Sequence, residues 1–314
     1  MVPTSPARRP DMLEQPESRS ATDATPLFER LQIESQSNCN RACWFCPRTY
    51  DRTGKYLDAA GKPVLRQMPT AKILGLLDEA QALGFRGLVG FHHYSEPLLD
   101  PRNTLLAQEA KRRGMVPYLH TNGDVLRRDE DLCEAVRSIY AFIVVGLYDY
   151  RTNDELEAAK QFWHERLAGA NLEFSPIGLS GGRSSHSIGV PRALVPPDRR
   201  MTLPDLTFRN APCHRPLIRM LVQHDGQVCL CCEDTSGAFG LGNVNDRPLA
   251  DIWFSDHHAR IIQDLKAGRR DQYALCRTCP MPPTGAPPPG LRVSFAPRHH
   301  RPPAAADPAC DAAR

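Results

Sequence analysis

The sequence predicts an α/β protein in which a parallel sheet is followed by a smaller module that carries grouped cysteines. From about residue 30 to residue 180, short apolar runs alternate with amphipathic segments, as expected for βαβ units. After about residue 200 this alternation gives way to a hairpin signal and several cysteines. The chain has 314 residues, 41% hydrophobic and 24% charged, so it can bury a core of ordinary size.

The strand candidates of the first part are short and rich in β-branched or aromatic residues. They are LQIESQS (31–37), GLVGFHH (87–93), VPYLHTN (116–122), AFIVVGLY (141–148) and LEFSPIG (172–178). The helix candidates between them repeat apolar residues every three or four positions, and three of them end near a glycine. These helices are expected at 70–84, 101–114, 127–138 and 153–169.

The second part begins with LIRMLVQHDGQVCLC (217–231), which predicts two strands joined at Asp225-Gly226. An amphipathic helix is expected near 249–266, before a terminal Cys-x-x-Cys. The two ends of the chain are rich in proline and polar or small residues and are expected to be disordered. The proposed units are a leader at 1–27, the sheet domain at 28–204, the cysteine module at 205–284 and a tail at 285–314.

Composition excludes several classes of function. The formal net charge of +3 gives no concentrated basic face for nucleic acid. No apolar run approaches the roughly 20 residues that span a bilayer, and the N-terminus lacks the apolar core of a secretory signal. We therefore expect a cytoplasmic protein with no membrane or nucleic-acid partner. The chain has eleven cysteines, mostly in groups, which in a reducing compartment indicates metal or redox chemistry rather than disulfides.

The first cysteine group is Cys39, Cys43 and Cys46, directly after the first predicted strand. The loop at the carboxyl end of a strand is where α/β folds place their chemistry. Three thiolates can hold three irons of a cubane [4Fe–4S] cluster and leave the fourth iron open to another molecule. The alternative is a zinc knuckle, but structural zinc usually takes four ligands.

The spacing Cys39-x3-Cys43-x2-Cys46, with an aromatic residue before the last cysteine, resembles the signature of the radical S-adenosylmethionine (SAM) enzymes. This resemblance implies a partial (β/α)6 barrel, similar to part of a TIM barrel. It also implies a [4Fe–4S] cluster whose open iron binds SAM. Reduction by a donor such as flavodoxin or ferredoxin would cleave SAM to a 5′-deoxyadenosyl radical, which abstracts a hydrogen from a substrate C–H bond.

The resemblance also implies SAM contacts. His93-Tyr94-Ser95-Glu96-Pro97 resembles the Gly-Gly-Glu-Pro segment that binds the SAM amino group, although the two glycines are absent here. The alternative role for Glu96 is a helix N-cap. The preceding histidines, His92 and His93, border this loop and either face the active site or are structural. The residues expected to contact SAM are Phe45 (adenine), Tyr94, Ser95, Glu96, Asn122, Ser175 and Arg183.

The second cysteine group resembles the SPASM/twitch extension of radical SAM enzymes, in a form with one auxiliary [4Fe–4S] cluster. The expected ligands are Cys213, Cys231, Cys276 and Cys279. Four thiolates saturate a cubane, so this cluster would carry electrons rather than bind substrate. A zinc site with the same ligands is the alternative. Cys229 is the fallback for Cys231, because both face the same way if the strand is unbroken.

The net reaction depends on the fate of the substrate radical. Oxidation would give a ketone, whereas a hydrogen donor such as Cys232 would give an epimer. We expect a small substrate, such as a sugar or aminocyclitol whose carbinol carbon is oxidised or epimerised. Modification of a ribosomal peptide by epimerisation or crosslinking is the first alternative, and a non-catalytic metal-binding scaffold is the second. His257 and His258 are expected to be solvated on a helix end.

Overall fold

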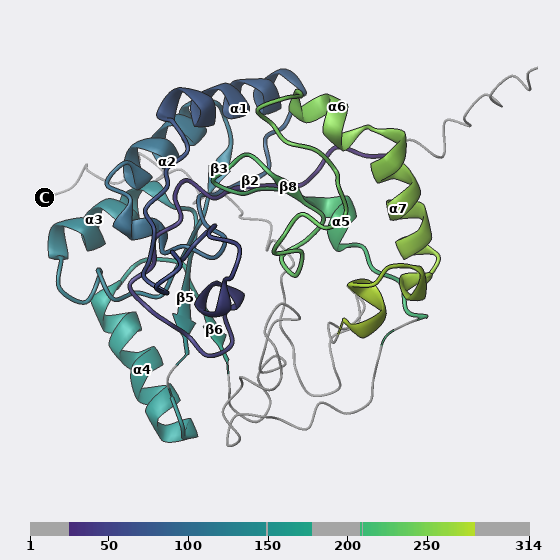
Figure 1. The fold of residues 1–314 in the computed structure, drawn as a ribbon. Coiled ribbons are helices and arrows are strands. Elements are labelled where there is room, and N and C mark those ends of the chain that lie inside the picture. The colour runs from purple at the N-terminus through teal and green to yellow at the C-terminus, as the bar shows by residue number, and fades with distance from the viewer. Residues whose placement is uncertain (1–24, 149, 178–207, 209, 280–314) are drawn as a thin grey trace, which may run out of the picture.

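The computed structural model describes residues 25–148, 150–177, 208 and 210–279 (Figure 1). Its strands are β1 (Arg30–Ile33), β2 (Leu88–Gly90), β3 (Val116–Pro117), β4 (Leu119–Thr121), β5 (Ile143–Leu147), β6 (Leu172–Pro176), β7 (Arg219–Val222) and β8 (Val228–Cys229). They form two sheets, in the orders β3-β2-β1-β7-β8 and β4-β5-β6. Every pair is parallel except β7 and β8. The predicted α/β class with a mainly parallel sheet is confirmed.

The expected strand at 116–122 is divided. Only Tyr118 separates β3 from β4, and its backbone N–H donates to the Val89 carbonyl oxygen at 2.9 Å. Next to it, the N–H of Leu119 donates to the Phe142 carbonyl oxygen at 3.2 Å. The chain therefore changes partners at this point and passes from one sheet to the other, which curves the wall formed by the parallel strands.

Helices lie on the outside of this curved wall (Figure 1). They are α1 (Thr70–Ala82), α2 (Asn103–Arg112), α3 (Glu130–Ile139), α4 (Asn153–Arg166), α5 (Arg215–Ile218), α6 (Leu249–Trp253) and α7 (Asp256–Lys266). Short 3-10 turns are η1 (Pro47–Tyr50), η2 (Pro97–Leu99), η5 (Arg270–Gln272) and η6 (Cys276–Thr278). The four helices predicted in the first part are thus present.

Successive side chains of β1 point to opposite faces of the sheet, because side chains alternate along a strand. Leu31 and Ile33 are fully buried in the apolar core, which also contains Ile73 and Leu76 of α1. The alternate residue Gln32 is also buried, but its amide donates to the His92 carbonyl oxygen at 2.7 Å. One face of the wall is therefore apolar and packs under the helices, while the other carries buried polar groups.

Two expectations for the second part were wrong in detail. The helix at 249–266 is interrupted after Phe254, because the Ser255 hydroxyl accepts the His258 N–H at 3.2 Å and starts a new helix. The first strand of the hairpin starts at Arg219 rather than Leu217, because residues 215–218 form α5 with a proline in its first turn. The antiparallel hairpin itself is confirmed, with Gly226 at its turn.

Strand β7 pairs in parallel with β1 along four residues, Arg30 to Ile33 against Arg219 to Val222. The cysteine module therefore extends the same sheet as the first domain. At the other end, the folded part starts slightly before residue 28, since the Pro26 carbonyl oxygen accepts the Trp253 indole N–H at 2.8 Å. The rest of the proposed leader and the proposed tail lie outside the described residues.

Candidate functional site

The first cysteine group lies on the loop that leaves the carboxyl end of β1. Cys39, Cys43 and Cys46 are partly buried residues with free thiols. The Cys46 N–H donates to the Cys43 carbonyl oxygen at 3.0 Å, and the Thr49 hydroxyl donates to the same oxygen at 2.9 Å. Burial raises the pKa of the Cys46 thiol to about 12, and the charge of Cys39 adds to it. A metal centre would therefore have to displace a proton from this thiol.

Glu96 lies beside this loop, and its N–H donates to the Asn38 carbonyl oxygen at 2.9 Å. Its buried carboxylate caps η2 by accepting the Leu98 N–H at 3.1 Å. The same oxygen, Oε1, accepts the Thr121 hydroxyl at 2.6 Å, and Oε2 accepts the Asn122 N–H at 2.8 Å. Glu96 therefore acts as a helix N-cap, and its geometry is also compatible with the predicted contact to the SAM amino group. Oε2 receives one described hydrogen bond and can accept a second.

The turn after β4 joins the same loop. The Asn122 side-chain amide donates to Asn40 Oδ1 at 2.8 Å, and Asn40 in turn donates to Asp124 at 2.9 Å. The Arg41 guanidinium binds both oxygens of Asp124, at 2.7 and 2.5 Å. Four polar side chains thus hold the cysteine loop against the turn that follows β4. Sequence reasoning singled out only Asn122 among them.

An aromatic pair lies next to the first cysteine group. The Phe45 ring contacts the Tyr148 ring at 5.0 Å between centroids, and the Tyr148 hydroxyl lies 3.2 Å from His120 Nε2. Burial, followed by the charges of Cys43 and Glu96, raises the pKa of Tyr148. Ser175 lies on β6 opposite Gly146 of β5, half-buried. Arg183 lies outside the described residues.

Tyr94 connects the two cysteine groups. Its N–H donates to Glu34 Oε1 at 2.9 Å, and its hydroxyl donates to the Cys232 carbonyl oxygen. The neighbouring Ser95 hydroxyl is buried and has no hydrogen-bond partner within the described part of the chain. Tyr94 is therefore directed toward the second module, whereas the Ser95 hydroxyl is an unsatisfied polar group next to Glu96.

The second cysteine group gathers from three segments of the C-terminal module. The Cys213 N–H donates to the Leu265 carbonyl oxygen at the end of α7 at 2.8 Å, and the Cys279 N–H donates to the Cys276 carbonyl oxygen at 3.2 Å. Burial, followed by the charges of Cys213 and Cys279, raises the pKa of Cys276 to about 12. Burial, then Cys232, Glu233 and Cys213, raises the pKa of Cys231. These interactions bring Cys213, Cys231, Cys276 and Cys279 into one neighbourhood.

Cys229 and Cys231 do not share a facing, contrary to the expectation from an unbroken strand. Strand β8 ends at Cys229, and Cys231 follows in a bend. Cys229 is buried, and apart from burial its pKa is raised mainly by Asp234, with Lys55 and Glu34 also nearby. Its surroundings are therefore those of β1 and the loop at 55, not those of the other module cysteines.

Cys232 lies between the two groups. Arg215 Nη1 lies 3.8 Å from the Cys232 thiol. Burial first, and then the proximity of Cys232 among other groups, raises the pKa values of Tyr118 and Tyr94. Arg215 itself is surrounded by thiols: the charges closest to it are Cys232, Cys231, Cys213 and Cys279. Its Nε is buried and has no hydrogen-bond partner among the described residues.

This arrangement suits an anionic group with sulfur ligands. A buried guanidinium without a compensating charge is costly, and thiolates would supply that charge. Across the described residues, no three Cys, His, Asp or Glu side chains lie close enough to hold a single metal ion.

The polar face of the wall was missed by sequence reasoning. The His92 ring lies 5.3 Å from the Tyr118 ring and 5.2 Å from the His120 ring. Arg30 of β1 and Arg219 of β7 lie near Tyr118 as well, and burial lowers the pKa of Arg30. The alternation of polar Arg30 and Gln32 with apolar Leu31 and Ile33 along β1 was the available signal. Of the residues expected near this face, His92 is buried in it, and burial lowers its pKa well below the usual range.

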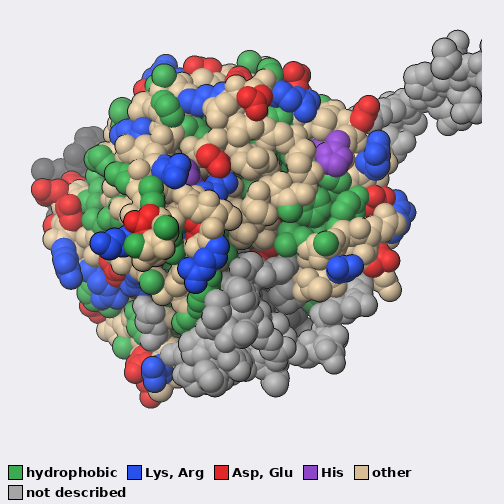
Figure 2. Space-filling model, in the orientation of Figure 1, with side chains coloured by type: hydrophobic (Ala, Val, Ile, Leu, Met, Phe, Trp, Pro, Cys, Tyr) green, Lys and Arg blue, Asp and Glu red, His purple; other side chains and the backbone are tan. Residues whose placement is uncertain are grey.

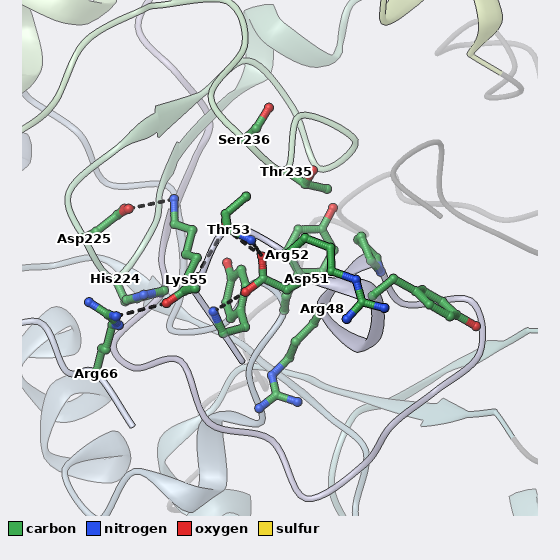
Figure 3. Close-up of a pocket in the computed structure, with 15 residues that line it drawn as sticks. Arg48, Asp51, Arg52, Thr53, Lys55, Arg66, His224, Asp225, Thr235 and Ser236 are labelled. Carbon is green, nitrogen blue, oxygen red and sulfur yellow. Dashed lines mark hydrogen bonds and ion pairs between the residues drawn. The ribbon is translucent and has the colours of Figure 1, made fainter. Parts of the chain in front are cut away.

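A separate cavity of about 510 Å³ adjoins the first cysteine loop (Figure 3). Pro47 and Arg48 line one side, and His224 and Asp225 of the hairpin line another. Figure 3 shows Lys55 reaching toward Asp225, with Nζ and Oδ2 2.7 Å apart. The remaining lining residues include Tyr50, Asp51, Arg52, Thr53, Gly54, Tyr56, Arg66, Tyr94, Thr235 and Ser236. The cavity is polar and carries charges of both signs.

The surface has no strong bias of charge on the face in view. Figure 2 shows acidic and basic side chains interspersed over this face. None of the helices built from described residues is long and apolar enough to cross a membrane.

His257 and His258 differ from each other: His257 is exposed, whereas His258 is buried and its Nδ1 lies 2.7 Å from the Trp253 carbonyl oxygen. The expectation that both are solvated was wrong for His258.

The chain matches the SPASM family, an iron–sulfur cluster-binding domain, over residues 213–280. It is 26% identical over 264 residues to the S-adenosyl-L-methionine-dependent 2-deoxy-scyllo-inosamine dehydrogenase of Niallia circulans, an alignment covering 81% of this chain and 93% of that protein. Its fold is similar to that of BtrN in complex with AdoMet and 2-DOIA, with a TM-score of 0.61, 22% identity and coverage of 81% of this chain and 93% of that one. BtrN in an open conformation matches with a TM-score of 0.56 at 22% identity, over 81% and 92% of the two chains.

Proposed function

We propose that this chain, a radical SAM enzyme related to BtrN with a SPASM iron–sulfur domain in its C-terminal region, oxidises a carbinol carbon of a small polar molecule such as an aminocyclitol. The observation that carries this proposal is the polar face of the barrel wall. Buried histidine, tyrosine and arginine side chains lie there, near both cysteine groups. Such a surface can hydrogen-bond the hydroxyl and amino groups of a polyol.

In this proposal Cys39, Cys43 and Cys46 hold a SAM-binding [4Fe–4S] cluster, and Cys213, Cys231, Cys276 and Cys279 hold one auxiliary [4Fe–4S] cluster. The three thiols on one loop, with a carboxylate beside them, support the first assignment. The mutual charges of the four module cysteines support the second, and Cys229 is not among them.

The SAM contacts are proposed from the same geometry. Glu96 Oε2 has acceptor capacity for an ammonium, and Asn122 holds the carboxylate in place. Phe45, Tyr94, Ser95 and Ser175 remain proposed contacts, with the buried Ser95 hydroxyl in need of a partner. When bound, SAM and the first cluster would supply a 5′-deoxyadenosyl radical able to remove one hydrogen atom from the substrate, and the auxiliary cluster would supply an acceptor for the electron released as the ketone forms.

The protein's own part is to hold the polyol and to accept the proton released when the carbinol becomes a ketone. His120 is placed for this, because it lies at the carboxyl end of β4, one residue before Thr121, and its Nε2 is 3.2 Å from the Tyr148 hydroxyl. Histidine is the side chain most often used for proton transfer near neutral pH.

The test is an anaerobic assay with 2-deoxy-scyllo-inosamine, the compound in the name of the Niallia circulans relative. The reconstituted and reduced protein should convert SAM to 5′-deoxyadenosine and produce a ketone in equal amounts. About eight irons per chain are expected from two cubanes. Formation of no 5′-deoxyadenosine by protein with full iron content would refute the chemistry, whereas 5′-deoxyadenosine without ketone would refute only the substrate.

Epimerisation remains a second candidate, because Cys232 lies close enough to Tyr118 on the polar face to add, after burial, to the raised pKa of that tyrosine. In this alternative the Cys232 thiol would return a hydrogen atom to a substrate radical. The variant Cys232→Ala separates the two outcomes. A dehydrogenase should retain ketone formation to within a few-fold, while an epimerase should lose its product although SAM cleavage continues. Deuterium uptake from solvent into recovered substrate would favour epimerisation in the wild type.

A further inference from the structure

Arg215 is a partly buried cation of the second module. It is the first residue of α5 and follows Cys213 by two positions, so the helix start places its side chain beside the cysteines. Its Nη1 lies 3.8 Å from the Cys232 thiol, and its Nε is buried without a partner among the described residues. One nitrogen of the guanidinium therefore faces sulfur, while another is shielded from solvent and lacks a hydrogen-bond partner among the described residues.

The charges around Arg215 come from sulfur. The Cys232 thiol is 3.8 Å from Nη1 and directly follows Cys231 in the sequence, and Cys213 precedes Arg215 by two positions. Removing a guanidinium nitrogen from water is costly unless a hydrogen-bond acceptor or a negative charge replaces the water. Metal-bound thiolates carry negative charge, so they would stabilise the side of the guanidinium that faces the module cysteines.

We propose that Arg215 is a positioning residue for the auxiliary cluster, whose guanidinium stabilises the negative charge of the cluster and raises its reduction potential. This inference rests on the proposed function, since it requires the four module cysteines to hold a [4Fe–4S] cluster. Adding an electron makes a thiolate-bound cubane more negative, so a nearby cation stabilises the reduced form more than the oxidised form. Net charge and hydrogen bonds to sulfur are known determinants of cluster potentials.

This role matters for the proposed oxidation. An auxiliary cluster that accepts an electron from the substrate must have a potential high enough to take it. Arg270 is a second arginine in the module and is also buried, but its guanidinium donates to the Pro212 carbonyl oxygen at 2.9 Å. That contact gives Arg270 a part in holding the backbone before Cys213, although its Nε, like that of Arg215, is buried without a partner among the described residues.

The test uses the full chain with Cys39, Cys43 and Cys46 replaced by alanine, so that one cluster gives the signal. Midpoint potentials are measured by redox titration with electron paramagnetic resonance after iron counting. Arg215→Gln should shift the midpoint to more negative potential, and Arg215→Lys should shift it less, because it keeps the charge but not the planar fork. Arg260→Gln is the matched control: it removes one exposed positive charge from α7, where solvent screens it.

The outcomes separate this inference from the proposed function. Absence of iron in the triple-alanine chain itself would refute the auxiliary cluster. With the cluster present, an unchanged or more positive midpoint in Arg215→Gln would overturn the role of Arg215 alone. If Arg215→Gln fails to assemble the cluster but Arg215→Lys still binds iron, the result supports a requirement of the cluster for a positive charge at residue 215. Failure of both variants to assemble it, with the helical circular dichroism intact, would overturn that requirement.

Discussion

At the scale of single residues, Glu96 performs a structural task that the sequence allowed as an alternative to binding. Its carboxylate accepts three hydrogen bonds, from Leu98, Thr121 and Asn122. Burial nevertheless raises its pKa to about 7, against the effect of these donors. Without a cation nearby, the carboxyl group is thus only partly ionised near pH 7. A bound ammonium would favour its ionised form.

Glu96 should therefore make the stability of the protein, measured without SAM or iron, depend on pH. The folded pKa lies above the unfolded value of 4.5, so the native state holds the proton longer. Stability is greatest below pH 4.5 for this group and falls by up to about 3 kcal/mol as pH rises through 7. Glu96→Gln should flatten that dependence in urea unfolding between pH 5 and 8. The exposed Glu157→Gln should not, and identical profiles for wild type and Glu96→Gln would contradict the prediction.

At the scale of elements, local sequence features predicted where helices and turns start, whereas contacts between distant residues were not predicted. The helix α4 starts with a full capping box at Thr152 and Glu155, and the hairpin turns at Asp225-Gly226, both of which are local features. The break between α6 and α7 was overlooked because the apolar period continues across Ser255. The burial of His258 depends on Trp253, which packs 4.5 Å from it, and a helical pattern alone does not specify such a contact.

The hairpin turn offers a test of how strictly the module is positioned. Gly226 has φ +85°, and a methyl group there would lie 2.5 Å from both the Asn243 and Asn245 side chains. Those amides donate to the Asp225 carbonyl oxygen at 3.1 and 3.0 Å. Gly226→Ala should cost about 1–2 kcal/mol for the left-handed backbone, plus about 1 kcal/mol for each hydrogen bond lost.

The matched control is Gly61→Ala, because Gly61 also has a positive φ, +74°, but has no atom within 4 Å of the added methyl group. It should show the backbone cost alone. Chemical unfolding of both variants measures the difference. Equal losses in the two would mean that the asparagine contacts around the turn contribute nothing, and the hairpin would then be less rigidly held than its hydrogen bonds indicate.

At the scale of the whole molecule, the two parts share a sheet and a buried polar link. Glu34, at the end of β1, is fully buried and binds His224 Nδ1 at 2.8 Å and the Tyr56 hydroxyl at 2.9 Å. Burial opposes ionisation, but the hydrogen bond from His224 and nearby histidine charges hold the pKa of Glu34 below its usual range. Sequence analysis identified the cysteines of both parts but not this contact, because residues 190 positions apart carry no periodic signal.

This link predicts that the barrel does not fold without the cysteine module. A chain ending at residue 204 lacks β7, so β1 loses its partner from Arg219 to Val222 and becomes an exposed edge. It also removes His224, whose Nδ1 lies 2.8 Å from the Glu34 carboxylate, and a hydrogen bond to a charged group contributes about 1.5–3 kcal/mol. Together with the lost strand pairing, this is a large share of the roughly 5–15 kcal/mol by which native domains are stable. The shortened chain should therefore aggregate or show no cooperative thermal transition by circular dichroism.

A chain ending at residue 284 retains every described residue and should unfold cooperatively. Matching transitions in the two chains would mean that the barrel is independent of the module, and the shared sheet would then be a docking contact between two separately stable parts.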